Sequence, residues 1–100
     1  MLTSKQILSR LDRNKARIDH LGVDRIGLFG SYARDEQKDS SDIDILVSFK
    51  QGEERYSNLF ELHEFLVEIL GTNVEIVTMG GLSPYIGPHI LKEVKFIETT

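Results

Sequence analysis

The sequence predicts a small α/β (α+β) fold in which a mixed β-sheet of about three strands packs against about four helices. Three observations lead to this class. Apolar stripes with helical spacing alternate along the chain with short apolar runs of strand length. Glycines or polar loops separate most of these segments. The length of 100 residues, 40% of them apolar and 28% charged, suits a single domain over 1–100 with one modest core.

The first half of the chain is expected to form a helix and two strands. Thr3 and Gln6 match a capping box, so a helix begins there and extends to about Leu21, before Gly22. Its apolar stripe consists of Ile7, Leu8, Leu11 and Ile18. The following segments are a strand over Arg25–Phe29, one or two helical turns over Tyr32–Arg34, a polar loop over Asp35–Ser41 and a strand over Asp42–Phe49.

The second half repeats this alternation. A charged connector over Gln51–Arg55 leads into a long helix over Tyr56–Leu70, which ends at Gly71. The expected buried stripe of that helix is Leu59, Leu62, Leu66 and Ile69, widened by Phe60, Phe65 and Val67. A third strand follows over Asn73–Thr78. Pro88 is expected to open a last helix whose apolar residues are Ile90, Leu91, Val94 and Ile97.

Composition excludes several classes of function. The chain has no cysteine, which excludes disulfides, zinc–thiolate sites and thiol nucleophiles. The net charge of −4 argues against nucleic acid as a direct ligand, because such binders neutralise many phosphates. No apolar run has the length of a bilayer span, and no signal peptide opens the chain. We therefore expect a cytoplasmic protein without a membrane partner.

Gly30 and Ser31 stand directly after a predicted strand. Glycine lets the backbone turn sharply and approach a ligand closely. The Ser31 hydroxyl and free backbone N–H groups can then bind phosphate oxygens. By itself the pair is more typical of an ordinary turn with a helix cap than of a phosphate site, and both interpretations stay open at this point.

Asp42 and Asp44 place two carboxylates on one face of an otherwise apolar strand. Residues i and i+2 of a strand point to the same side, with Cα atoms roughly 6–7 Å apart. Such like charges repel one another, and a divalent cation with a preference for hard oxygens turns that repulsion into ligation. The alternative is a solvated strand end with two surface acids.

Glu75 adds a third carboxylate between the apolar residues Val74 and Ile76. If the second and third strands are neighbours, Glu75 lies beside Asp42 and Asp44. Three carboxylates on adjacent strands can hold two Mg²⁺ ions about 3.5–4 Å apart, which supports in-line phosphoryl or nucleotidyl transfer. The alternative is an exposed acid on an edge strand.

Together these features form one continuous motif. The stretch from Gly30 to Val47 reads GSYARDEQKDSSDIDILV, with ten residues between Ser31 and Asp42. It resembles the G-S-x10-D-x-D signature of the DNA polymerase beta nucleotidyltransferase superfamily, and most closely its minimal nucleotidyltransferases of the MNT antitoxin type. The resemblance spans nearly the whole chain, including the leading helix, the third-strand acid and the closing ILKEVKFIE segment.

The resemblance implies roles for individual residues. Gly30 and Ser31 correspond to the phosphate-binding turn, Asp42 and Asp44 to the paired metal ligands, and Glu75 to the third catalytic carboxylate. Glu75 then either accepts a hydroxyl proton or serves only as a metal ligand. Arg34 matches the arginine of the family's G-S-x-A-R, where it either contacts nucleotide phosphate or braces the loop by pairing with an acid.

Two residues depart from the family pattern. Asp35 stands where the family commonly has glycine, and Glu75 stands where the third acid is usually aspartate. Asp35 tolerates a left-handed turn but adds negative charge near the phosphate path. The longer Glu75 side chain shifts a metal ligand outward.

The resemblance also implies cofactors and a partner. It implies Mg²⁺ or Mn²⁺, ATP as the donor substrate, and AMP transfer to a hydroxyl, as a rule that of a tyrosine, on a HEPN-domain toxin. The protein would then act as the antitoxin. Two alternatives stay open: a catalytically weak nucleotide-binding module that neutralises the toxin by occlusion, and a nucleotide sensor that binds ATP without transfer.

Overall fold

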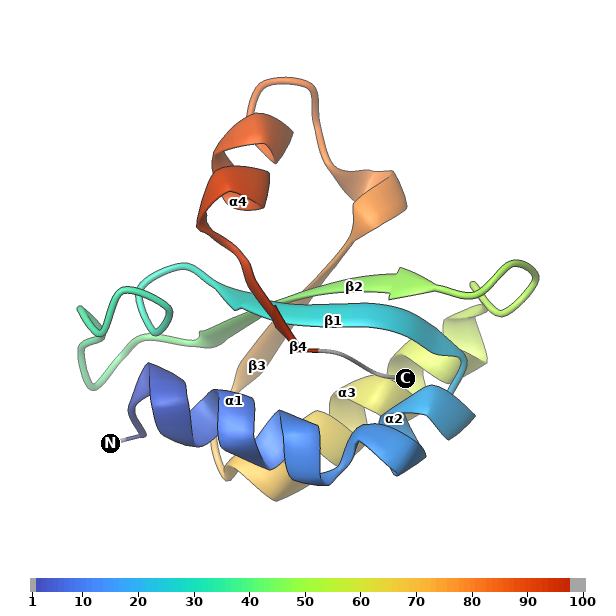
Figure 1. Ribbon diagram of the computed structural model, residues 1–100, viewed down its shortest axis with the longest axis horizontal. Helices are drawn as coiled ribbons and strands as arrows, with labels where there is room; N and C mark the ends of the chain where they lie inside the picture. Colours follow the sequence, from blue (N-terminus) through green and yellow to red (C-terminus); the bar gives the residue numbers. More distant parts are fainter. Residues whose placement is uncertain (1, 98–100) are drawn as a thin grey trace.

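The computed structural model describes residues 2–97 and places helices on both faces of one four-stranded sheet (Figure 1). In chain order the elements are α1 (Ser4–Arg13), α2 (Lys15–His20), β1 (Val23–Phe29), β2 (Ile43–Phe49), α3 (Tyr56–Leu70), β3 (Val74–Thr78), the 3₁₀ turn η1 (Met79–Gly81), α4 (Gly87–Glu93) and β4 (Lys95–Ile97). This arrangement confirms the predicted mixed α/β (α+β) class, with one strand more than expected.

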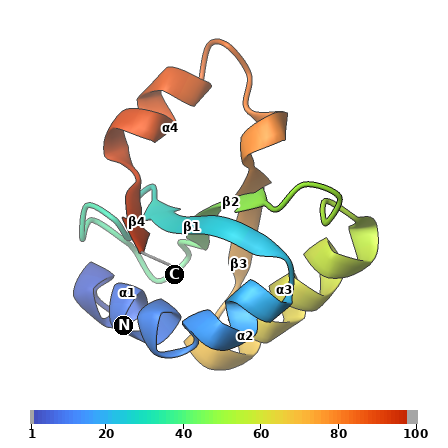
Figure 2. The ribbon, with the colours of Figure 1, turned by 45° about the vertical axis from the view of Figure 1, so that its right-hand side comes forward.

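The sheet has the strand order β3-β2-β1-β4. β1 runs antiparallel to both of its neighbours, β2 and β4. β2 and β3 run parallel, so the chain must cross over between them, and α3 makes that crossover (Figure 2). The two strands that carry the predicted carboxylates are therefore neighbours, as the hypothesis of a shared site requires.

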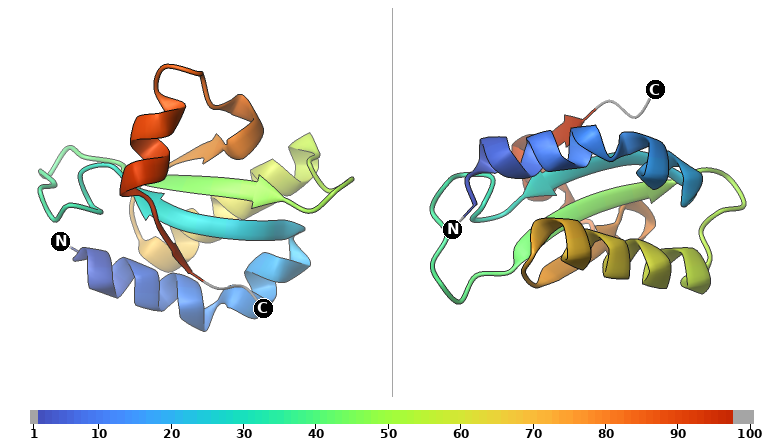
Figure 3. Two further views of the ribbon diagram at one scale, coloured as in Figure 1. Left: turned by 45° about the horizontal axis from the view of Figure 1, so that its top comes forward. Right: turned by 90° about the horizontal axis from the view of Figure 1, so that it is seen from below.

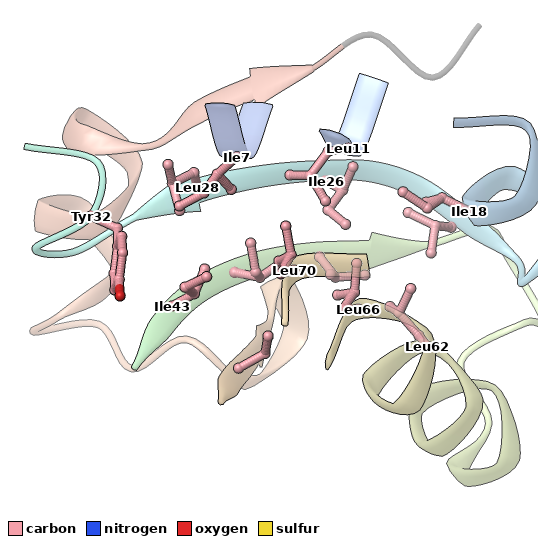
Figure 4. Packing of buried hydrophobic residues seen from close by; sticks show 14 of the residues in the cluster. Ile7, Leu11, Ile18, Ile26, Leu28, Tyr32, Ile43, Leu62, Leu66 and Leu70 are labelled. Carbon is pink, nitrogen blue, oxygen red and sulfur yellow. The ribbon is translucent and has the colours of Figure 1, made fainter. Parts of the chain in front are cut away.

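Helices α1, α2 and α3 cover one face of the sheet, and α4 with η1 lies over the other (Figure 3). The main core fills the space between the sheet and the first three helices (Figure 4). Its fully buried side chains are Ile7, Leu11, Ile18, Val23, Ile26, Leu28, Ile43, Ile45, Val47, Leu62 and Leu66. A smaller cluster around Phe29, Leu46 and Ile90 packs beneath α4. Alternate residues of each strand thus face two apolar layers.

The N-terminal helix begins as predicted but is divided. The Thr3 hydroxyl accepts a hydrogen bond from the Gln6 N–H at 3.1 Å, and the Gln6 side chain accepts one from the Thr3 N–H at 2.9 Å, which completes the capping box. The single helix expected up to Leu21 is interrupted at Asn14, whose φ of −108° and ψ of 15° are not helical. The Asn14 side chain donates to the Arg10 carbonyl, a local bond that competes with the helical pattern.

The long helix α3 has the predicted bounds, and Gly71 ends it in the left-handed conformation with φ of 70°. Its most buried residues are Leu62, Leu66 and Leu70. The buried face of α3 therefore includes Leu70, in place of the expected Leu59 and Ile69. Phe60, which was expected to widen that stripe, is 55% exposed.

The segment after α4 differs from the prediction. A helix was expected through the ILKEVKFIE stretch, but α4 ends at Glu93, Val94 is extended, and β4 pairs with β1; residue 98 lies outside the described residues. Gly27 makes this pairing possible, because a β-carbon there would lie 2.7 Å from Val94 Cγ2 and 2.9 Å from Phe96 Cδ1. The close approach of backbone to side chains explains a glycine inside a central strand.

Candidate active site

The strand register brings two of the predicted carboxylates side by side. Asp44 of β2 pairs with Glu75 of the parallel strand β3, and with Phe29 of β1 on its other side. Asp44 alternates with buried Ile43 and Ile45, so its side chain lies on the sheet face that α4 covers. Asp42 is exposed, immediately before β2, with the same parity as Asp44. Asp42, Asp44 and Glu75 therefore belong to one end of one sheet face.

Gly30 brings the following turn against this acidic group. It immediately follows β1 with φ of +78°, and a β-carbon at this position would lie 2.1 Å from Asp44 Oδ2. Only glycine combines that backbone angle with that close approach. The Gly30–Ser31 backbone therefore packs directly against the carboxylate of the second strand.

The segment after Gly30 is a series of turns and not the helix that was expected over Tyr32–Arg34. The Gly30 carbonyl accepts hydrogen bonds from the N–H groups of Ala33 and Arg34, and the Ser31 carbonyl accepts one from Glu36 N–H at 2.9 Å. Within residues 2–97 the Ser31 hydroxyl makes no hydrogen bond, so it does not serve as a helix cap there. Its oxygen is available to a ligand.

Asp35 is directed toward the start of α1. It adopts the left-handed conformation with φ of 55°, as glycine would. Its two carboxylate oxygens accept hydrogen bonds from the Ser4 N–H at 2.8 Å and the Ser4 hydroxyl at 2.9 Å. These bonds hold the pKa of Asp35 below its usual range. The carboxylate of Asp35, which distinguishes this chain from the family pattern, thus binds Ser4 and connects the turn to α1.

Arg34 pairs with two acids. Its Nη1 group donates to Glu93 Oε1, and its Nε group lies 3.3 Å from Glu36 Oε1. The hydrogen bond and charge of Glu93 raise the pKa of the Arg34 guanidinium. Of the two roles that the sequence left open for Arg34, the described structure contains the bracing one.

Glu93 is a site residue that the sequence did not indicate. It lies at the end of α4, and its Oε2 atom accepts a hydrogen bond of 3.2 Å from the Gly30 N–H. The two partners are 63 positions apart in the sequence, and the helix that was expected to continue past Glu93 gave no sign of a turn there. The alternation of Val94, Lys95 and Phe96 is typical of a strand and could have indicated that the helix ends before it.

The crowded carboxylates alter the titration of Asp44. The pKa of Asp44 is raised to about 6, first by burial of the carboxylate and then by the negative charges of Glu75, Asp42 and Glu93. Arg34 opposes this effect only weakly, as the last of the contributing groups. The site therefore has an excess of negative charge, which a cation would neutralise.

The donor set suits a hard cation, since it consists of carboxylate oxygens. In the described conformation, however, no group of three or more His, Cys, Asp or Glu side chains within residues 2–97 is placed to hold a metal ion. Asp44 and Glu75 are adjacent in register, and Asp42 is exposed and not fixed by any hydrogen bond within those residues. The residues thus fit a metal by their chemistry and by their positions on neighbouring strands.

A hollow of about 340 Å³ adjoins Glu75 on the side of α3. Its lining is mainly apolar and consists of Tyr56, Leu59, Phe60, His63, Val74, Glu75 and Ile76. Tyr56 is 83% exposed, so the outer wall of the hollow is open to solvent.

Within residues 2–97, no helix combines the length and the apolar character needed to cross a membrane.

Comparison with known proteins places these features in a family. The nucleotidyltransferase domain family matches residues 5–97. A curated relative, the protein adenylyltransferase MntA of Thermococcus cleftensis, is 39% identical over 98 residues, which covers 97% of this chain and 98% of the relative. The match includes the turn after β1, both strands with acidic residues and the segment that contains Glu93.

Solved structures share the fold. One, assigned as a minimal nucleotidyltransferase, has a TM-score of 0.73 and 32% identity and covers 88% of this chain and 93% of its own. Another, a toxin–antitoxin crystallised with AMP-PNP, has a TM-score of 0.63 and 27% identity over 83% of this chain and 71% of its own. Both similarities extend well beyond the signature motif to the arrangement of the whole sheet.

Proposed function

This chain belongs to the nucleotidyltransferase domain family, and from that premise we propose that it transfers AMP from ATP to a tyrosine hydroxyl of a HEPN-type toxin, whose antitoxin it is. One observation supports this most directly: the register pairs Asp44 with Glu75 directly beside the Gly30–Ser31 turn. A phosphate-binding turn and a group of carboxylates at the same strand ends are what nucleotidyl transfer requires.

The proposed reaction is an in-line displacement at the α-phosphorus of ATP. The acceptor hydroxyl oxygen forms a bond to the α-phosphorus, the bond from that phosphorus to the bridging oxygen of the β-phosphate breaks, and pyrophosphate leaves. The hydroxyl proton passes to a neighbouring carboxylate, and Glu75 is the candidate. The Gly30 N–H and the Ser31 hydroxyl would bind phosphate oxygens and orient the chain of phosphates.

Asp42, Asp44 and Glu75 would hold Mg²⁺ or Mn²⁺. When bound, such an ion stabilises negative charge on the transferring phosphate and on the leaving pyrophosphate, and lowers the pKa of the attacking hydroxyl. The raised pKa of Asp44 supports this assignment, because burial and the neighbouring carboxylates both disfavour its negative charge without a counter-ion. We expect ATP binding itself to need the cation for the same reason.

The partner is inferred from the family resemblance and from the kind of proteins that match. The structure crystallised with AMP-PNP is a toxin–antitoxin, and the curated relative is named a protein adenylyltransferase. We place the reaction in the cytoplasm, and we treat residues 1–100 as one nucleotidyltransferase domain that meets its acceptor on another protein.

A second candidate function is neutralisation of the toxin by occlusion without AMP transfer. It is favoured by one specific observation, namely that no three of the acidic side chains described here are placed to hold a metal ion. The Asp35 departure does not favour it, because that carboxylate is bound to Ser4.

The deciding experiment incubates the protein with ATP labelled at the α-phosphate, Mg²⁺ and the HEPN-type protein encoded beside it. We expect label on a tyrosine of the partner, and none when EDTA replaces Mg²⁺. The matched control changes Asp42 and Asp44 to Asn, which should abolish labelling while the variant keeps its fold. Tight association without any label would contradict AMP transfer and support occlusion.

A further inference from the structure

Glu93 places a carboxylate of the chain itself on the turn that follows β1. Its Oε2 atom accepts the hydrogen bond from the Gly30 N–H at 3.2 Å, while its Oε1 atom is bonded by the Arg34 guanidinium. One carboxylate therefore contacts both the first backbone donor of the turn and the guanidinium of Arg34. The side chain is about a quarter exposed, so it has access to solvent.

These two donors are the groups that a nucleotide phosphate would need. Carboxylate and phosphate oxygens accept the same charge-assisted hydrogen bonds from backbone N–H and guanidinium groups. The Gly30 N–H cannot donate fully to both at once. A triphosphate that enters the proposed site must therefore displace Glu93 or bind without this donor.

The rest of the α4–β4 segment is fastened independently of Glu93. Lys95 Nζ donates to the Ala33 carbonyl at 2.7 Å, and Ile90 and Val94 pack in the cluster beneath α4. β4 is hydrogen-bonded to β1. The Glu93 side chain can consequently leave the turn by rotating toward solvent while the backbone that carries it stays in place.

We infer that Glu93 is a positioning residue which occupies the phosphate-binding turn in the absence of nucleotide and yields the Gly30 N–H and Arg34 to the phosphates of ATP. This inference rests on the proposed function, because it requires that the turn binds a nucleotide. It assigns Arg34 both roles that the sequence allowed: pairing with an acid before binding, and contact with phosphate after it.

The test measures ATP affinity by calorimetry in Mg²⁺ for wild type, Glu93→Gln and the control Glu36→Gln. Glu36 is the other acid beside Arg34, but among residues 2–97 its side chain makes no hydrogen bond to Gly30. We expect Glu93→Gln to bind ATP about 5- to 30-fold more tightly, since the nucleotide no longer displaces a charged acceptor. Glu36→Gln should change affinity less than threefold, roughly the effect of one exposed charge.

A second readout follows the Gly30 amide by NMR, which does not depend on catalysis. In the protein without nucleotide, Glu93→Gln should shift the Gly30 amide resonance, and with ATP the wild-type and variant resonances should coincide. A Glu93→Ala variant should also bind ATP more tightly than wild type, and its melting temperature should be lower than that of wild type.

The outcomes separate this inference from the function on which it rests. If wild type binds ATP but Glu93→Gln binds equally or more weakly, Glu93 only supports the fold and the inference is overturned. If Glu93→Gln and Glu36→Gln increase ATP affinity equally, the loss of one negative charge near the turn explains the effect. That result would also overturn the inference. If none of the three proteins binds ATP, the nucleotide site itself is wrong, and the inference falls with it.

Discussion

Gly30 and Asp44 lie so close together that the site depends on the absence of one carbon atom. A β-carbon on residue 30 would overlap Asp44 Oδ2, and the φ of +78° there already disfavours any other residue. Gly52 offers a matched comparison, because it has a similar φ of +83° but nothing within 4 Å of its imagined β-carbon. The two positions separate the cost of the backbone angle from the cost of the contact.

We therefore expect Gly30→Ala to be the more damaging of the two changes. Gly52→Ala should lower the free energy of unfolding by about 1 kcal/mol through backbone strain alone. Gly30→Ala should lower it by about 2–4 kcal/mol, because Asp44 must also move. Urea unfolding of both variants measures the difference, and equal losses would mean that the Gly30–Asp44 contact is easily relieved.

Asp44 should make the stability of the protein depend on pH. Its pKa is raised to about 6 in the folded protein from 3.8 in the unfolded chain. The folded state therefore binds more protons between these values, and stability falls as pH rises through that window. Asp44→Asn removes the effect. After allowance for solvent screening of a partly exposed group, it should stabilise the protein by about 1 kcal/mol at pH 7.

The measurement is urea unfolding in EDTA at pH 3.5, 5 and 7. The advantage of Asp44→Asn should be absent at pH 3.5 and complete at pH 7, because protonated aspartate and asparagine are both neutral. Asp39→Asn, a change in the exposed loop, serves as the control without such a trend. An advantage that is independent of pH would show that charge repulsion at Asp44 is not its cause.

At the scale of elements, the sequence predicted those features whose cause is local. The capping box, the bounds of α3 and the strand positions of Asp44 and Glu75 all follow from spacing within a few residues. The pairing of the parallel strands could be stated only as a condition, since it depends on how α3 crosses over. Glu93 could not be identified, because it joins the site through the path of α4 and β4 across Gly27.

Asp35 shows how a departure from the family pattern can serve an element and not the chemistry. Its carboxylate connects the turn to the start of α1 through Ser4. We expect Asp35→Gly, which restores the family's usual residue, to lower the melting temperature and leave ATP affinity unchanged. The stabilisation that Asp35 gives the wild-type protein should also decrease as pH falls, because a carboxylate with a lowered pKa loses its contribution once it is protonated.

Thermal unfolding and calorimetry of the same preparation test this expectation, with Asp35→Asn as the matched variant. Asparagine keeps the tolerance for a left-handed turn but loses the charge, so it should fall between wild type and Asp35→Gly in melting temperature. Markedly tighter ATP binding by either variant would mean that the Asp35 charge does act on the phosphate path.

At the scale of the whole molecule, the question is whether the fold works as an enzyme or as a partner that only covers the toxin. The sheet positions the acids, the turn and Glu93 from four separate segments, an arrangement that occlusion alone would not need. Substitution of Glu75 distinguishes AMP transfer from occlusion most clearly. It is an exposed residue on β3, so its replacement should leave the core intact.

We expect Glu75→Gln to reduce AMP transfer to the HEPN-type partner at least 100-fold while ATP affinity changes less than about fivefold. The neutral amide keeps the shape of the side chain but neither accepts a proton nor ligates a cation well, and general-base catalysis alone contributes roughly 10²–10⁴-fold. Loss of an interaction made only in the transition state lowers turnover without a matching change in binding. Glu75→Asp, the family's usual residue, should retain transfer and so show that the site accepts either length. If wild type and both variants all fail to transfer AMP, yet all three bind and silence the partner, the carboxylates have no catalytic role and occlusion is the function of this fold.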